Sequence, residues 1–480
     1  MDSIIAFIIL AGPLCLSVVP ASWKQYDPKT SAPGYILLQA DSREEATELV
    51  EQGGQNQHPF RDVEEGNEAS SRPTSTGAFN YKNLLRNQTR QWWTRVSAYL
   101  VILFVAIGIG AQYEQPGDSR FRPAINAAVA FPNSTGYARQ ERIFFAAMFS
   151  NNEAVIPYWA ASLMKAIHYL GTDNVFVSIL ESNSHDRSPQ LLRDFAEMLA
   201  KTNVAHRVLT DDTAVERSNW VDTNMERINF LSAVRNRAIE PLVEKGGYDK
   251  LVFSNDIYIE PETIIELLET ADGNYDMACG LDFGSYGGYD AWVLRDRQGK
   301  LTSTVWPYFF DEVDYRGMQV EAPIPVFSCW NGIIVARADP LIPIHLRSNH
   351  TLSTEPLPYS LPTTHPAAHN ASLSRPSPAL TPAIRFRASA SEECFSSESF
   401  LLPYDLRRQF DMQRIFVNPR VITAYKWRYY MYFKWFLRHP LLKWWIQKLY
   451  DVSWMRKNIK VVGNPAKVWW WDGGDCHPFA

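Results

Sequence analysis

The chain has 480 residues, the length of one large domain or of two ordinary domains with appendages. Its 46% hydrophobic and 21% charged residues exclude a chain that is disordered throughout and a bundle of many membrane helices. A net charge of -5 argues against general nucleic-acid binding, which needs a basic surface to displace phosphate counterions. The five cysteines have no metal-ligand spacing and give no support for a zinc site.

Residues 1–91 are rich in Gln, Glu, Ser and Gly and predict a cytosolic tail that is mostly disordered. Within residues 1–20, the apolar run at 4–19 resembles the core of a signal peptide, but no basic residue precedes it. A second anchor, a cleaved signal and a wrongly assigned start all stay open for this run.

A second apolar run, at 96–111, predicts a single membrane-spanning signal anchor at residues 92–113. Trp92, Trp93 and Tyr99 extend it into an interfacial belt. Four basic residues crowd its N-terminal side: Lys82, Arg86, Arg90 and Arg95. By the positive-inside rule the N-terminus is cytosolic and the C-terminal part is lumenal. A buried core helix is the alternative, because sixteen apolar residues also fit a globular protein.

After a stem at 114–140, β-type runs alternate with helical patterns from residue 141 onward. Strands are expected at 142–149, 174–182, 204–210 and 248–259, and helices at 156–170, 189–201, 226–244 and 261–269. This alternation predicts an α/β fold with a mainly parallel sheet, in a domain at 141–425. A Pro-, Ser- and Thr-rich insertion at 346–382 is expected to be unstructured; a functional lid and translated intron sequence are alternatives.

Ligands bind at the carboxyl ends of the strands in open α/β sheets, so the loops there carry the candidate site. One strand delivers Ser254, Asn255 and Asp256 to that edge, before a helix that begins at Pro261. Asp256 is suited to hold Mg²⁺ or Mn²⁺ against a diphosphate, because hard cations use one or two carboxylates plus substrate oxygens. The alternative is that Asp256 only caps the turn or the helix.

The helical pattern before this strand carries Arg235 and Asn236 beside an apolar stripe. Arg is suited to bidentate phosphate contact and Asn to orienting a sugar or the strand tip. Glu181 ends an earlier strand, where its carboxylate can accept from ribose hydroxyls or a base edge. Solvated helix charges and a simple turn are the alternatives for these residues.

Several segments in order resemble one family, among them FFAAMFSNNEAVIPYW, NVFVSILESNSHD, YDKLVFSNDIYI, MACGLDF, YDAWVLRD and FSCWNGIIV. They are similar to the fungal capsule-associated α-1,3-mannosyltransferases, glycosyltransferase family 69, over residues 141–345 and 384–425. The resemblance implies a type A glycosyltransferase fold, a GDP-mannose donor and a divalent cation, Mn²⁺ or Mg²⁺. It also implies transfer to the 3-hydroxyl of a mannose-containing glycan with retention, in the Golgi or endoplasmic reticulum membrane.

Within this resemblance, Asn255 and Asp256 depart from the Asp-x-Asp pair of many type A enzymes, which leaves a second metal ligand open; Asn255 is expected to help bind the donor. Asp282 is expected in the active centre near the donor sugar, and Glu398 on the acceptor side. Trp330 and Asn331 suit acceptor recognition, with a core tryptophan as the alternative. His477 is a further candidate metal ligand, as C-terminal His residues are in some type A enzymes.

The C-terminal extension at 426–480 is basic and aromatic: between Tyr425 and Lys460, twelve aromatic and nine basic residues face one acid. In a lumenal domain this composition fits a membrane surface or an anionic glycan, and the alternative is an amphipathic helical cover for the catalytic domain. Two other functions stay open for the whole chain. One is a non-catalytic glycan-binding or scaffolding relative, and the other is a transferase with another nucleotide sugar.

Overall fold

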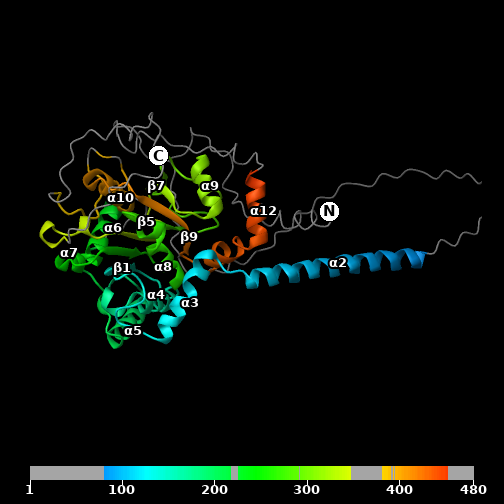
Figure 1. Ribbon diagram of the computed structural model, residues 1–480, viewed down its shortest axis with the longest axis horizontal. Helices are drawn as coiled ribbons and strands as arrows, with labels where there is room; N and C mark the ends of the chain where they lie inside the picture. The colour runs from blue at the N-terminus through cyan, green and yellow to red at the C-terminus, as the bar shows by residue number, and fades with distance from the viewer. Residues whose placement is uncertain are drawn as a thin grey trace, which may run out of the picture.

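The computed structural model describes residues 81–217, 225–290, 292–347, 381–390, 393 and 395–451. The apolar run at 4–19, most of the expected insertion at 346–382, and His477 lie outside the described residues. Figure 1 shows a body built around one sheet, with a long helix extending away from it.

The body is organised around a nine-stranded sheet with the order β3-β2-β1-β4-β8-β5-β9-β7-β6. Most of these strands are buried along their whole length, so they read as continuous apolar runs in the sequence. The strands are β1 (Ile143–Phe149), β2 (Val175–Glu181), β3 (Ala205–Leu209), β4 (Lys250–Ser254), β5 (Met277–Phe283), β6 (Arg295–Asp296), β7 (Ile324–Ser328), β8 (Ile333–Arg337) and β9 (Ile415–Ala424).

The sheet is mixed, which corrects the prediction of a mainly parallel sheet. The block β3-β2-β1-β4 is parallel throughout, as the alternation of strands and helices predicts. In the other half β5 and β9 pair in parallel, whereas β8 is antiparallel to both β4 and β5, and β7 is antiparallel to β6 and β9. The strands of this half lie beyond the last clear strand–helix repeat in the sequence, where periodicity does not reveal direction.

Helices cover both faces of the sheet. On one face α3, α4 and α8 pack against each other, and α5 packs beside α4 and β3; on the other face α6 and α10 pack together. The expected helix at 226–244 is two helices, because Pro241 begins a new one after Ile239. The helices of the body are α3 (Pro116–Ala130), α4 (Ile156–Leu170), α5 (Ser188–Lys201), α6 (Met225–Ala238), α7 (Glu240–Lys245), α8 (Pro261–Leu268), α9 (Glu312–Val320) and α10 (Glu398–Phe410). Four short 3₁₀ turns complete the body: η2 (Thr172–Asn174), η3 (Thr270–Gly273), η4 (Asp339–Leu341) and η5 (Ile344–Leu346).

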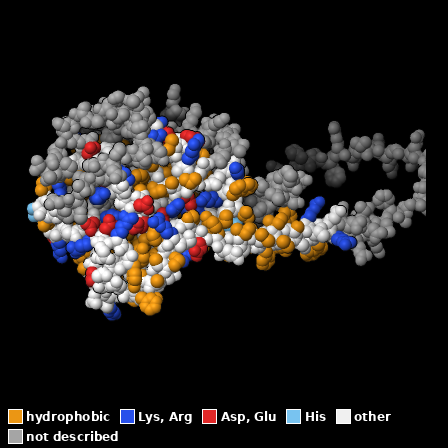
Figure 2. Space-filling view, in the orientation of Figure 1, with side chains coloured by type: hydrophobic (Ala, Val, Ile, Leu, Met, Phe, Trp, Pro, Cys, Tyr) orange, Lys and Arg blue, Asp and Glu red, His pale blue; other side chains and the backbone are white. Residues whose placement is uncertain are grey.

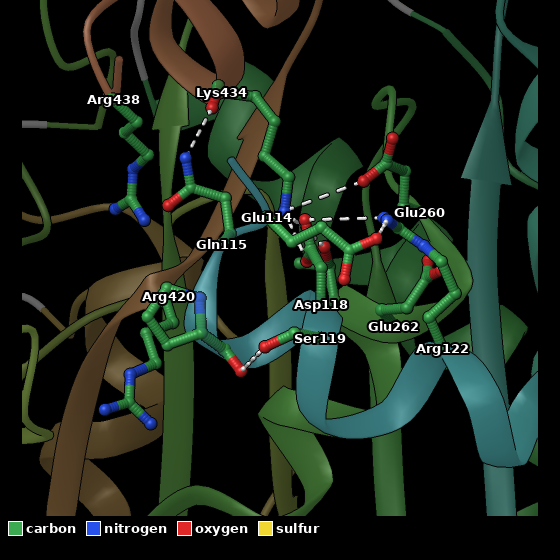
Figure 3. Close-up of polar contacts among 12 residues, drawn as sticks. Glu114, Gln115, Asp118, Ser119, Arg122, Glu260, Glu262, Arg420, Lys434 and Arg438 are labelled. Carbon is green, nitrogen blue, oxygen red and sulfur yellow. Dashed lines mark hydrogen bonds and ion pairs between the residues drawn. The ribbon is translucent and has the colours of Figure 1, made fainter. Parts of the chain in front are cut away.

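The range expected to be a stem contains α3, which packs into the body. Its residues Phe121 and Ile125 are 6% and 1% exposed and belong to the main core. A group of charged side chains fixes α3 in place (Figure 3), and we call it the α3 ion cluster: Asp118, Arg122, Glu260, Glu262 and Lys434. The fully buried Lys434 ammonium lies 2.8 Å from Asp118 and 3.6 Å from Glu260.

The long helix is α2 (Tyr81–Gln112). It begins eleven residues before the expected anchor at 92–113, so its first part belongs to the range expected to be a disordered tail. Residues 90–112 are long and apolar enough to cross a membrane, and none of that stretch is buried in the protein. The structure therefore does not bear out the alternative of a buried core helix.

The described part of the C-terminal extension closes the body beside α2. It contains α11 (Trp427–Tyr430), one turn of π-helix η7 (Met431–Phe436) and α12 (Pro440–Asp451). Phe433 stacks on Phe283 of β5 with ring centroids 3.6 Å apart, so this segment covers the end of the sheet. Within the described residues, Cys279 of β5 and Cys329 of the loop before β8 form a disulfide bond.

Candidate active site

The topology brings polar residues from distant parts of the chain to one edge of the sheet. β4, β5 and β9 run in the same direction and antiparallel β8 begins where they end. Because of this arrangement Asp256, Asp282, Asn331 and Tyr425 all lie at the same edge. The edge is the one at which β1 and β2 also end.

Asp256 follows β4 and is half-buried. Its Oδ2 accepts a 2.7 Å hydrogen bond from Asn152 Nδ2, in the loop after β1. Burial raises the pKa of Asp256 to about 6, and hydrogen bonds and the positive charge of Arg235 only partly oppose that shift. The carboxylate therefore carries negative charge that the surrounding protein compensates incompletely.

Asn255 connects the tip of β4 to the neighbouring strands. Its Nδ2 donates to the Tyr425 hydroxyl at 2.9 Å, and its Oδ1 accepts from Trp330 Nε1 at 3.1 Å. The Tyr425 hydroxyl in turn donates to Asp282 Oδ2 at 3.1 Å. Asn255 therefore orients the strand tip in this structure, and both polar atoms of its side chain are hydrogen-bonded to protein groups.

Asp282 is 1% exposed near the end of β5 and accepts hydrogen bonds from Asn331 Nδ2 at 3.0 Å and from the Asp290 amide at 3.3 Å. Burial raises the pKa of Asp282, and burial together with the adjacent Asp282 charge raises the pKa of Asp290 well above its usual value. Because the charge of Asp282 raises the pKa of Asp290, the two carboxyl groups favour sharing one proton. Asp290 was not among the predicted site residues. The signal was present, since Asp290 lies in the Gly- and Tyr-rich loop that follows Asp282.

A cavity of about 10 Å³ opens beside this acidic pair, lined by Asp282, Asp290, Thr302 and Asn331 among others. Within the described part of the chain, Asn331 Oδ1 and Thr302 Oγ1 are buried without a hydrogen-bond partner. The space is close to that of one water molecule, so a water or a small polar group can satisfy both atoms.

Arg235 and Glu398, predicted separately as donor and acceptor residues, form one buried ion pair. Arg235 Nε donates to Glu398 Oε1 at 3.0 Å, and the guanidinium lies 4.3 Å from the centroid of the Trp330 ring. Arg235 Nη1 and Glu398 Oε2 are buried and lack a hydrogen-bond partner among the described residues. Each member of the pair thus has one buried polar atom that the described residues leave without a hydrogen bond.

The structure gives Glu181 and Asn236 contacts that the sequence did not predict. Glu181 is fully buried, and its two oxygens accept from the amides of Ser184 and Asp211, so it ties two loops together. The Asn236 amide donates to the Phe386 carbonyl at 2.7 Å and accepts from the Phe386 amide at 3.0 Å. Both side chains hold other parts of the chain, and we leave them out of the revised site.

Trp330 is 0% exposed and packs between Phe253, Phe386 and Arg235, so the core alternative describes it and no face is open to an acceptor. Asn331 keeps its place beside Asp282. The backbone φ of Asn331 is +32°, which is rare for a residue other than glycine. In this conformation the side-chain amide of Asn331 faces Asp282 and donates to it.

The carboxylate oxygens of Asp256 are suitable ligands for a divalent cation of the Mg²⁺ or Mn²⁺ type. Such ions are held through few protein carboxylates, with phosphate and water oxygens completing the shell. Among the residues that the structure describes, no three His, Cys, Asp or Glu side chains are grouped to hold a metal ion. The residues at this edge therefore suit a metal site in which one or two protein carboxylates bind the cation and substrate oxygens complete its coordination.

A family model described as cryptococcal mannosyltransferase 1 matches residues 142–405, more than half of the chain. The chain belongs to this mannosyltransferase family. Asp256, Asp282, Asp290 and Glu398 all lie inside the matched range. The family resemblance identified from sequence segments is thereby confirmed. No curated protein matches the chain.

Solved glycosyltransferase structures resemble the chain only distantly. A mannosyltransferase from Pyrobaculum calidifontis, in complex with GDP-Man and Mn²⁺, is 10% identical over 68% of this chain and 66% of its own, with a TM-score of 0.30. Glucosyl-3-phosphoglycerate synthase from Mycobacterium tuberculosis is 16% identical over 45% and 61%, with a TM-score of 0.23. TarS 1–349 of S. aureus, in complex with UDP, is 13% identical over 59% and 60%, with a TM-score of 0.31. The chain thus spans less than two thirds of each, and these scores carry no argument about it.

Proposed function

We propose that the chain is a membrane-anchored α-1,3-mannosyltransferase of type A fold that transfers mannose from GDP-mannose to the 3-hydroxyl of a mannose-containing glycan, with retention. Membership of the mannosyltransferase family supports the class of reaction. The observation that carries the assignment of the site is the acidic group at the strand ends: Asp256 follows β4, Asp282 lies near the end of β5 and accepts from the Asp290 amide, and the positive charge of Arg235 acts on Asp256 and Asp290.

Asp256 would hold Mn²⁺ or Mg²⁺, which neutralises charge on the diphosphate when bound. Asn152 orients the Asp256 carboxylate through its 2.7 Å hydrogen bond. Arg235, held by Glu398, keeps Nη1 available for an anionic or hydroxyl group of a substrate. Asn255 and Tyr425 fix the tip of β4 relative to Asp282.

Asp282 and Asp290 are the groups that we place beside the donor sugar. Asp282 in its ionised form stabilises the positive charge that develops at the anomeric carbon, and Asp290 in its protonated form donates to a sugar hydroxyl. Retention requires no base that activates water, because the leaving diphosphate accepts the proton of the acceptor hydroxyl. The raised pKa values of both carboxyl groups support this division of roles.

We also propose that α2 spans the membrane of the Golgi or endoplasmic reticulum, with the tail at 1–91 in the cytosol and residues 114–480 in the lumen. The length and apolar character of residues 90–112 and the basic residues before residue 96 support this orientation. The domain limits expected from the sequence stay part of this proposal.

Calorimetry on the full chain in lipid nanodiscs tests the proposal, with GDP titrated in the presence of Mn²⁺ and of a chelator. GDP binding should require Mn²⁺ and should be lost in Asp256→Asn, while Asp194→Asn, an exposed residue of α5, should bind like the wild type. Cation-dependent binding of UDP in place of GDP would indicate another nucleotide sugar. Absence of binding to either nucleotide by the folded chain would replace the enzyme by the scaffolding alternative.

A further inference from the structure

Large apolar side chains are exposed on the end of η7 and the start of α12. We call Trp435, Phe436, Leu441 and Trp444 the aromatic belt; they are 36%, 52%, 50% and 60% exposed. Neighbouring Phe433 and Lys434 are buried, so the belt is the outer side of a well-packed segment. A group of exposed apolar residues of this size on one segment points to an interaction surface.

The belt lies directly beside the apolar helix α2. His439, between Phe436 and Leu441, has its Nε2 2.7 Å from the Ala106 carbonyl oxygen of α2. The His439 ring also approaches Gly110 so closely that a Cβ atom there would lie 2.5 Å from it. Ala106 is six residues before the end of α2, which is about 9 Å along the helix axis. The start of α12 therefore lies at the level of the apolar stretch of α2.

The direction of α2 relative to the body is fixed. Only residues 113–115 separate α2 from α3, and the α3 ion cluster holds α3 to α8 and η7 (Figure 3). Gln115 adds a hydrogen bond from its Nε2 to the Lys434 carbonyl oxygen. The same cluster thus holds the end of α2 and the start of the belt in one arrangement.

α12 runs across the direction of α2 rather than along it (Figure 1). A membrane that α2 crosses would therefore have α12 lying roughly in its plane. Among residues 440–448 of α12, the exposed positions are Leu441, Trp444 and Lys448, whose spacing of three and four residues places them on one face of the helix. Figure 2 shows hydrophobic side chains continuing from α2 onto the adjoining part of the body.

We propose that the aromatic belt rests in the headgroup region of the bilayer that α2 spans, so that the catalytic body is held against the lipid surface at two places. Trp suits this region because its ring is apolar while its indole N–H can donate a hydrogen bond, and Phe and Leu bury apolar surface at the boundary with the acyl chains. Lys448, exposed on the same face, reaches lipid phosphates. The proposal rests on the membrane anchor of the proposed function and assigns a lipid-binding role to a segment that no step of the transfer reaction uses.

Three exposed phenylalanines make a matched test. Phe104 lies in α2 and is 74% exposed, Phe436 lies in the belt and is 52% exposed, and Phe131 lies at the far end of α3 and is 74% exposed. Each is replaced in turn by the photoreactive analogue benzoylphenylalanine in the full chain, reconstituted in nanodiscs of phosphatidylcholine and phosphatidylserine. After irradiation, the adducts are identified by mass spectrometry. Wild-type melting temperature confirms that each variant is folded, and Trp444 is the second belt position if the Phe436 variant does not fold.

Phospholipid adducts are expected at Phe104 and Phe436 and not at Phe131. Adducts at Phe104 alone would leave the anchor in place and overturn the belt proposal. Absence of lipid adducts at both Phe104 and Phe436 would overturn the anchor as well. Crosslinks from Phe436 to protein, either a second copy or residues 452–480 of the same chain, would also overturn it, because the belt would then be covered by protein rather than by lipid.

Discussion

Two buried groups of charged side chains, the α3 ion cluster and the acidic site at the strand ends, differ in how their charges are matched. In the α3 ion cluster every carboxylate lies within 4.0 Å of Lys434 or Arg122. At the strand ends Glu398 pairs with Arg235, whereas Asp256, Asp282 and Asp290 form no ion pair within the described residues. Carboxylates that form ion pairs hold structural elements together. Buried carboxylates without an ion-pair partner lower the stability of the folded protein, and such groups are typical of ligand sites.

The largest effect is expected from breaking the matched group. Lys434→Met removes the buried ammonium and leaves Asp118 and Glu260 without it, which should lower the free energy of unfolding by about 3–5 kcal/mol. Thermal unfolding in nanodiscs measures the loss, and the transfer rate per folded molecule should be unchanged. Lys201→Met, which breaks only an exposed pair with Glu197, should leave the melting temperature unchanged. A wild-type melting temperature for Lys434→Met would show that the cluster does not fix α3.

A substitution in the acidic site at the strand ends should have the opposite effect: it should lower activity without lowering stability. Asp282→Asn keeps the side-chain shape but removes the charge beside the donor sugar, so the transfer of mannose from GDP-mannose should fall by about 100- to 1,000-fold. The melting temperature should stay the same or rise, because a buried charge is lost. Product formation with a mannoside acceptor measures the rate, with Asp194→Asn as the surface control. An undiminished rate would remove Asp282 from the active centre.

The pH dependence of stability sharpens the same contrast. The pKa of Asp282 is raised by burial from 3.8 in the unfolded chain to about 6 in the folded chain. Between these values the folded state binds more protons than the unfolded state, so Asp282 makes the wild type less stable as pH rises from about 4 to about 6. Above about pH 6, the loss of stability caused by the Asp282 charge itself no longer changes with pH.

Asp282→Asn should therefore gain stability relative to the wild type across this window, by about 2–3 kcal/mol, and the gain should grow further at higher pH, because the Asp282 charge also raises the pKa of Asp290 in the wild type. Melting curves from pH 4 to pH 8, recorded with a chelator, measure the difference between the two proteins. A constant difference across the whole range would mean that the Asp282 carboxyl titrates normally.

The strand–helix alternation was sufficient to predict the parallel half of the sheet and the edge at which its strands end, because β1, β2 and β4 are short apolar runs followed by helices. It was not sufficient for β8, whose apolar run is compatible with either direction. Asp256 was predicted because it follows such a run, and Asp282 was expected within the family resemblance. Asp290 was missed because its proximity to Asp282 arises from a loop that returns to the strand end, which periodicity does not report.

Polar residue type alone does not reveal the tertiary contacts of Trp330 and Asn236. An aromatic ring beside an amide resembles a sugar site in sequence, but the Trp330 ring is covered on all sides and only its Nε1 is used, by Asn255. Whether a polar side chain serves a ligand or its own chain depends on tertiary partners. The segment at 381–390, distant in sequence, supplies the partner of Asn236.

The smallest of these effects separates the two roles considered for Asn236. Asn236→Ala leaves the amide and carbonyl of buried Phe386 without their partner, which should lower the free energy of unfolding by about 1–3 kcal/mol. The KM for GDP-mannose should be unchanged, because the Asn236 amide is fully used by Phe386. Asn236→Asp, which keeps the acceptor for the Phe386 amide but not the donor, should lie between the wild type and Asn236→Ala in stability. The exposed Gln190→Ala on α5 is the control. A raised KM with unchanged stability would return Asn236 to the donor site, and it would mean that Phe386 moves away when the nucleotide binds.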